Sequence, residues 1–133
     1  MIRVRCLAVV LFAFAAPASA APEPVTDLRC RAEPSPGRVL CELEITSERG
    51  RLAWADALVV ATPPFARPLR SRVAGREVTE RRREVPLAFV ATAAGEGEIE
   101  VEARAVVCDD VCLPVSRRVR APLRVGVVQE GPR

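Results

Sequence analysis

Two cysteines stand close together near the C-terminal end of the sequence, in the segment CDDVC, where Cys108 and Cys112 flank a short acidic stretch. A close cysteine pair can cycle between dithiol and disulfide by thiol exchange. Ahead of the pair, charged and apolar residues alternate from Glu98 to Val107. A period of two is typical of a β-strand with one buried face. The pattern predicts that Cys108 ends a strand on its polar face, at the tip of a hairpin.

The redox compartment follows from the first twenty residues, which have the features of a signal peptide. Arg3 and Arg5 precede an apolar run, and Ala18-Ser19-Ala20 provides the small-x-small pattern of a cleavage site. The apolar run is shorter than the roughly 20 residues that span a membrane. We therefore expect a signal peptide at 1–20 and one mature domain at 21–133. Its location would be the periplasm, or the exterior where no outer membrane exists, with a short uncleaved anchor as the alternative.

Four cysteines remain in the mature chain, and an even number in a small exported protein favours disulfides. Cys30 and Cys41 flank a turn signal at 34–37, so they are expected opposite each other on neighbouring strands. Cys108 and Cys112 form the remaining pair. The spacing thus favours these two pairs over the other possible pairings.

The two predicted rings differ in size and in expected reactivity. Loop closure should contribute about 2.8 kcal/mol for Cys30–Cys41 and about 2 kcal/mol for the smaller Cys108–Cys112 ring. A three-residue hairpin loop commonly places its last residue in the left-handed region, which the β-branched Val111 disfavours. We therefore expect Cys30–Cys41 to be structural and Cys108–Cys112 to be strained, exposed and reactive. A second inert clip is the alternative.

The rest of the mature chain predicts an all-β, antiparallel β-sandwich, because alternating runs are separated by turn residues and no sustained helical period is present. Trp54 and Phe89 are expected in the core, and the segment Glu48 to Trp54 could hold one helical turn. A long irregular loop is expected from Pro63 to Glu77, and Pro86 and Pro122 indicate edges or bulges. The predicted strands are Val25 to Ala32, Arg38 to Thr46, Ala57 to Thr62 (buried on both sides), Arg83 to Ala91, Gly97 to Cys108 and Val115 to Val128.

Composition excludes several classes of function. The mature chain has a net charge of about +1 and only three aromatic residues, which does not describe a nucleic-acid binder. The sequence contains no His, which excludes Cys-His nucleophilic catalysis and most zinc sites. We expect no cofactor, no metal and a monomer.

Half of the mature chain, Arg76 to Val125, resembles a known family. It is similar to the N-terminal periplasmic domain of the thiol:disulfide interchange protein DsbD. The similarity lies in the order of a VPL strand, an alternating strand that ends in Cys, an acidic loop, and a second Cys followed by Leu-Pro. In this sequence these positions are Val85-Pro86-Leu87, Cys108, Asp109-Asp110, Cys112, Leu113 and Pro114.

The resemblance implies an immunoglobulin-like sandwich in which Cys108 and Cys112 are the redox pair and Pro114 shapes the following strand. A cap loop with an aromatic residue shields the pair in that family, and the segment Pro63 to Gly75 with Phe65 is the candidate here. The implied partners are a thioredoxin-like domain or a DsbD-like membrane transporter as electron donor, and oxidised periplasmic thiol proteins as acceptors.

Nearby charges have opposite expected effects on a thiolate of the pair, and two other functions are alternatives. Asp109 and Asp110 should disfavour a thiolate, and Arg117 and Arg118 could offset them if they fold back. A structural or adaptor sandwich with two inert disulfides is one alternative. A copper(I) chaperone is the other, because CDDVCLP is also similar to the site of Sco-type chaperones, although those proteins use a His ligand and a thioredoxin fold.

Overall fold

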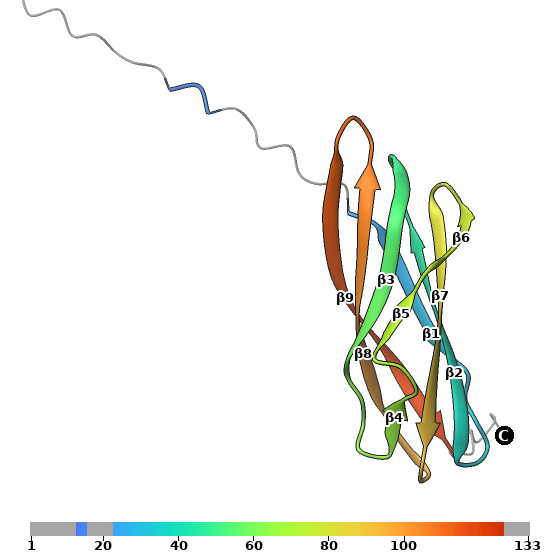
Figure 1. Ribbon diagram of the computed structural model, residues 1–133. Coiled ribbons are helices and arrows are strands. Elements are labelled where there is room, and N and C mark those ends of the chain that lie inside the picture. Colours follow the sequence, from blue (N-terminus) through green and yellow to red (C-terminus); the bar gives the residue numbers. More distant parts are fainter. Residues whose placement is uncertain (1–12, 16–22, 127–133) are drawn as a thin grey trace, which may run out of the picture.

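The computed structural model describes residues 13–15 and 23–126. Within these residues, all regular structure is β-strand (Figure 1). No helix in the described part is long and apolar enough to cross a membrane. The predicted signal peptide at 1–20 lies outside the described residues except for 13–15. The strands are β1 (Val25–Cys30), β2 (Gly37–Thr46), β3 (Arg51–Ala61), β4 (Ala66–Pro68), β5 (Arg72–Ala74), β6 (Arg76–Thr79), β7 (Arg82–Ala91), β8 (Gly95–Cys108) and β9 (Cys112–Val125).

The strands form two antiparallel sheets that pack face to face. One sheet has the order β1-β2-β7-β4, with β6 also paired to β7, and the other has the order β5-β3-β8-β9. In immunoglobulin-like sandwiches, strands A, B, E and D form one sheet and C, F and G the other. Here β1, β2 and β7 take the places of A, B and E, while β3, β8 and β9 take those of C, F and G. The predicted all-β, immunoglobulin-like antiparallel β-sandwich is confirmed.

The core lies between the sheets and is built from the alternating apolar positions of the long strands. Phe89 is its largest fully buried side chain, as the sequence predicted. The alternation predicted for β2 and β8 is also confirmed, because every second residue is buried. These residues are Val39, Cys41, Leu43 and Ile45 on β2 and Ile99, Val101, Ala103, Ala105 and Val107 on β8.

Strand β3 differs most from its prediction. The expected helical turn at Glu48 to Trp54 is wrong, because β3 already begins at Arg51. Trp54 is 38% exposed rather than in the core. The cause is a register shift between Leu52 and Trp54, which inserts an extra residue and turns Trp54 to the outer face. The end of β3 is also not buried on both sides, since Val60 is exposed.

The prolines and the predicted loop show how the edges are built. The segment expected to be irregular, Pro63 to Glu77, contains the short strands β4 and β5 and the start of β6. Pro86 lies on β7 between the residues that pair with β6 and those that pair with β4. Pro122 lies on β9, at the edge of its sheet. Both prolines therefore lie where a missing N–H costs little, as the sequence predicted.

Candidate functional site

The β8–β9 hairpin carries the predicted cysteine pair. Cys108 ends β8, Cys112 begins β9, and the two are directly opposite in the ladder. They form a disulfide with an S–S distance of 2.04 Å. Between them the Asp109 N–H donates a hydrogen bond of 3.2 Å to the Val111 carbonyl. The hairpin and the pairing agree with the sequence-based prediction.

The two cysteines differ in their exposure. Cys112 is exposed, whereas Cys108 is only 6% exposed, although its position in the alternation places it on the outer face of the sheet. The turn between β2 and β3 packs closely against the backbone of Cys108. A Cβ added to Gly50, whose φ is +77°, would lie 2.6 Å from the Cys108 carbonyl oxygen. A partner thiol would therefore reach Cys112 before Cys108.

The strain expected at Val111 is not present. Among the described residues, no residue other than glycine has a positive φ, so Val111 is outside the left-handed region. Its side chain is 67% exposed. Any special reactivity of this disulfide must therefore come from its exposure and neighbours.

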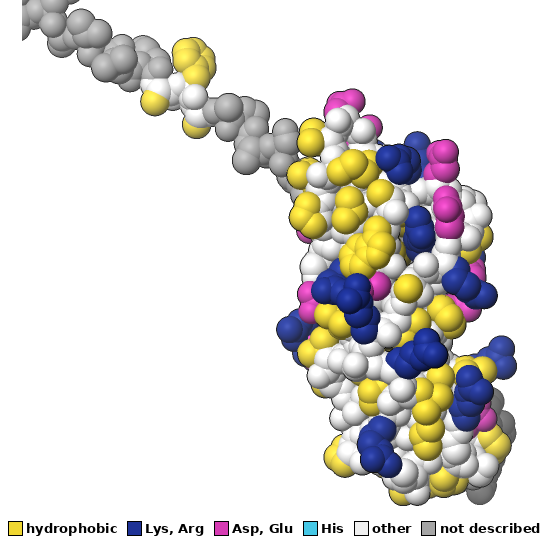
Figure 2. Space-filling model, viewed as in Figure 1, with side chains coloured by type: hydrophobic (Ala, Val, Ile, Leu, Met, Phe, Trp, Pro, Cys, Tyr) yellow, Lys and Arg dark blue, Asp and Glu magenta, His cyan; other side chains and the backbone are white. Residues whose placement is uncertain are grey.

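An apolar surface lies beside the disulfide on the outer face of the same sheet. Trp54, Val106 and Pro114 form one row across β3, β8 and β9, two residues from the cysteines along β8 and β9. They line a shallow groove of about 280 Å³. Leu113 at the start of β9 is also exposed, but it is opposite the core residue Val107, so it extends from the other face of the sheet and is not part of this surface. Figure 2 shows apolar side chains gathered over this part of the molecule, below acidic side chains at its upper end.

Two of the predicted site-shaping groups, Pro114 and the acidic pair, are thus next to the cysteines. Pro114 borders the groove, and Asp109 and Asp110 form the exposed loop between the cysteines. Arg117 and Arg118 do not fold back toward the pair. They lie opposite Ala103 and Glu102, five or more residues along β9, and Arg118 pairs with Glu100 at 3.7 Å.

Phe65, the aromatic residue of the predicted cap, is not brought to the cysteines. The Phe65 ring packs against Gly95, where an added Cβ would lie 2.7 Å from ring carbons. Gly95 begins β8, and Cys108 ends it. The length of a 14-residue strand therefore separates Phe65 from the disulfide. At about 3.3 Å per residue this is roughly 40 Å, so Phe65 does not cap the disulfide. The other end of the segment lies nearer, because the Gly75 N–H donates to the Ala55 carbonyl at 2.9 Å and Ala55 is opposite Ala105, three residues before Cys108. This end carries no aromatic residue.

A buried ion-pair cluster, which the sequence reasoning missed, lies next to the apolar groove. Asp56 on β3 is 1% exposed and accepts hydrogen bonds from Arg104 Nε (2.8 Å), Arg104 Nη2 (2.6 Å) and Arg72 Nε (2.7 Å). Burial alone would raise the pKa of Asp56, but these bonds and the two positive charges outweigh it and hold the pKa below its ordinary value.

The same cluster orients the exposed tryptophan. The guanidinium carbon of Arg104 lies 5.6 Å from the centroid of the Trp54 ring, within the range of a cation–π contact. Arg104 thus joins the buried Asp56 to Trp54. The signal that could have revealed this cluster is a single acidic residue within the apolar run ADALVV.

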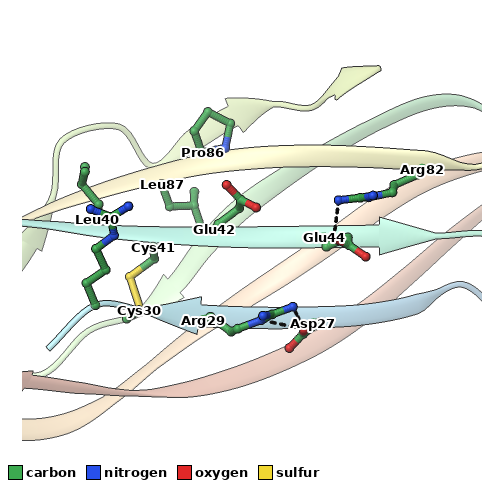
Figure 3. A pocket seen from close by; sticks show the side chains of 11 residues that line it. Asp27, Arg29, Cys30, Leu40, Cys41, Glu42, Glu44, Arg82, Pro86 and Leu87 are labelled. Atoms are coloured by element: carbon green, nitrogen blue, oxygen red, sulfur yellow. Dashed lines mark hydrogen bonds and ion pairs between the residues drawn. A yellow bond between two sulfur atoms is a disulfide. The ribbon is translucent and has the colours of Figure 1, made fainter. Parts of the chain in front are cut away.

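The second disulfide has a different setting. Cys30 and Cys41 are paired directly opposite each other on β1 and β2, and Cys41 belongs to the core, at 5% exposed. A groove of about 510 Å³ lies beside them, and the close view in Figure 3 shows ion pairs Arg29–Asp27 and Arg82–Glu44 along it. The position of Cys41 in the core agrees with the structural role expected for this pair.

Metal binding has no support in the geometry of the described residues. Within 13–15 and 23–126, no three His, Cys, Asp or Glu side chains gather in a way that could hold an ion.

Comparison with known proteins gives no family. No protein-family model matches the chain, and no curated protein matches it. One similar solved structure is the ASH / PapD-like domain of human CEP192 (PapD-like domain 7), with 10% sequence identity and a TM-score of 0.45 over 94% of this chain and 100% of that one. So weak a likeness carries no argument, and the fold assignment rests on the strand order described above.

Proposed function

We propose that this protein is a thiol–disulfide exchange protein of an oxidising compartment, with Cys108 and Cys112 as its redox pair. The observation that carries the proposal is the setting of this disulfide. It lies at a hairpin tip with Cys112 exposed and an apolar groove alongside. Cys30, the more accessible cysteine of the other disulfide, is only partly exposed and packs against the core, to which its partner Cys41 belongs. Exposed disulfides are the ones that exchange readily with thiols.

The exchange proceeds in two displacements. A thiolate of a reduced partner attacks Sγ of the exposed Cys112, the bond to Cys108 breaks, and the electron pair leaves on Cys108 Sγ, which takes a proton from water. The second thiolate of the partner then attacks the partner sulfur that is bonded to Cys112 in the mixed disulfide. The bond to Cys112 breaks, and Cys112 leaves as a thiolate. The partner is oxidised by two electrons and the pair is reduced by two.

The reduced pair can then pass these electrons onward. Cys112, as the accessible thiolate, attacks a disulfide of an oxidised protein, and Cys108 resolves the mixed disulfide. The electron donor in this proposal is a thioredoxin-like domain or a DsbD-like membrane transporter, and the acceptor is an oxidised periplasmic thiol protein. Support for these partners comes from the signal-peptide pattern, the sequence resemblance, and the exposed Trp54 at the groove, which suits contact with another protein.

A trapping experiment tests the proposal. The Cys108→Ser variant keeps the exposed thiol but lacks the resolving one, so it should accumulate a mixed disulfide with an oxidised thioredoxin-like protein. The Cys112→Ser variant should trap much less, since Cys108 is buried. The Cys108→Ser/Cys112→Ser double variant is the control and should trap none. Equal, negligible trapping by both single variants would contradict the proposal.

A structural or adaptor sandwich is the second candidate, and one observation favours it. Each disulfide joins residues that are directly opposite in a ladder, as expected of a clip that fastens two strands. If Cys108–Cys112 resists a reduced thioredoxin-like donor as firmly as Cys30–Cys41 does, the adaptor function is the better one.

A further inference from the structure

A cation lies beside the cysteine pair in the register of the sheet. Arg51, the first residue of β3, is directly opposite Cys108 on β8, and Cys108 is directly opposite Cys112 on β9. The three residues form one row across three neighbouring strands. Residues paired in this way extend from the same face of a sheet, with Cβ atoms about 4.5–5.5 Å apart. The side chain of Arg51 is therefore a lateral neighbour of Cys108, on the side away from Cys112.

Arg51 pairs with no carboxylate in the described part of the chain. Among the described residues it takes part in none of the ion pairs or side-chain hydrogen bonds, and it is exposed. Arg72 and Arg104, by contrast, bind Asp56, and Arg118 pairs with Glu100. A guanidinium free of such partners retains its full charge for a neighbouring anion.

The groups around Cys108 disfavour a thiolate there, so a nearby positive charge would stabilise it. The loop residues Asp109 and Asp110 disfavour a second negative charge near the sulfur, and burial of Cys108 disfavours its thiolate further. Other charged groups near this end of β8 are Glu48 and Arg49 on the β2–β3 turn and Glu80 and Arg81 on the β6–β7 turn, where Arg81 donates to the Glu48 carbonyl. Arg83 on β7 is held away from the cysteines, because its guanidinium donates to the Leu52 and Ala53 carbonyls at 3.1 and 3.3 Å.

We propose that Arg51 is the positioning residue that stabilises the thiolate of Cys108 when the disulfide opens. This inference deepens, and rests on, the proposed exchange function. When a partner thiolate attacks Cys112, the electron pair of the broken S–S bond moves onto Cys108, beside Arg51. A thiol with a lower pKa leaves faster, so this contact favours attack at the exposed sulfur and departure of the buried one.

The pKa of the Cys108 thiol tests the inference without any partner. In a Cys112→Ser background, the pH dependence of alkylation at Cys108 is measured with Arg51 unchanged, with Arg51→Gln and with Arg51→Lys. Removing the charge should raise the pKa by about half a unit to one unit at low ionic strength, and the lysine should restore most of it. The shift should shrink in concentrated salt.

The matched control is Arg38→Gln, which removes an equal charge from an exposed strand residue at the opposite end of the domain. It should leave the pKa of Cys108 unchanged. An equal pKa in the Arg51→Gln and Arg38→Gln proteins overturns the inference. Arg51→Lys guards against a misfolded Arg51→Gln protein. If the pKa of Cys108 in Arg51→Lys equals that of the Arg51 protein, the role of charge is supported. If it equals that of Arg51→Gln, the role of charge is contradicted.

A second readout separates this inference from the function on which it rests. With both cysteines present, the rate of opening by a reduced thioredoxin-like donor should fall about twofold to threefold in Arg51→Gln. If the wild type exchanges and Arg51→Gln matches it in rate and pKa, the inference fails while the function stands. If the wild type does not exchange at all, the proposed function fails, and the inference fails with it.

Discussion

Removal of the two disulfides should destabilise the domain unequally. Consider Cys30→Ala/Cys41→Ala beside Cys108→Ala/Cys112→Ala. The sequence separations are 11 and 4 residues, so loop closure predicts losses of about 2.8 and about 2 kcal/mol. Cys41 and Cys108 are about equally exposed, at 5% and 6%, whereas Cys30 packs against the core and Cys112 is exposed. Ring size is the leading difference, at about 0.8 kcal/mol, and the lost packing of Cys30 acts in the same direction.

Urea unfolding followed by the fluorescence of the single tryptophan measures this difference. With a slope of about 1.5 kcal/mol per molar, typical of a small domain, the two double variants should differ by about 0.5 M in midpoint. In thermal unfolding the difference should be about 4 °C. The Cys30/Cys41 variant should be the less stable of the two.

The reasoning is refuted if the Cys108/Cys112 variant is equally or more destabilised. That result would mean that the hairpin tip fastens the fold, as an inert clip would. Because Trp54 lies near the tip, the same transitions should also be followed by far-ultraviolet circular dichroism, so that a local change at the groove is not mistaken for unfolding.

Three further predictions concern the surroundings of the site. Asp56→Asn should cost about 2 kcal/mol at neutral pH, because it removes a buried carboxylate from two arginines. Because the pKa of Asp56 is lowered in the folded state, its contribution to the free energy of unfolding is present above about pH 4 and is lost as the pH falls through the folded-state pKa. The stabilities of wild type and variant should therefore converge in acid. Parallel curves of stability against pH would contradict the cluster. Gly50→Ala should destabilise by more than about 1 kcal/mol in urea, since it combines a positive φ with a 2.6 Å approach to Cys108, and a neutral result would contradict that packing. Phe65→Ala should lower the melting temperature but leave the rate of thiol exchange at the hairpin unchanged, because Phe65 packs at the other end of β8. A changed exchange rate would support a capping role for Phe65.

The sequence predicted most where a long strand alternates. In β2 and β8 the period of two identified the buried face, and turn residues between Cys30 and Cys41 identified the hairpin that pairs them. The acidic loop between Cys108 and Cys112 and the spacing of the two cysteines were sufficient to predict the hairpin that joins them. These features are local, so they need no knowledge of the rest of the fold.

What the sequence did not predict depends on a single inserted residue or on packing between distant segments. The bulge before Trp54 reverses the face of that side chain, and no composition signal marks it. Strands β4 and β5 have three residues each, too few for a period to show. Gly50 packs closely against the backbone of Cys108, and a strand pattern read along β8 cannot reveal this contact.

Graded reduction with mapping of the cysteines tests the central claim most directly. The purified protein is incubated in buffers of increasing dithiol strength, alkylated, and analysed by mass spectrometry while circular dichroism records the fold. We predict that Cys108 and Cys112 are labelled first, with the sandwich intact and Cys30 still joined to Cys41. Labelling of Cys30 and Cys41 before Cys108 and Cys112, or together with them, would contradict a dedicated redox pair at the β8–β9 tip.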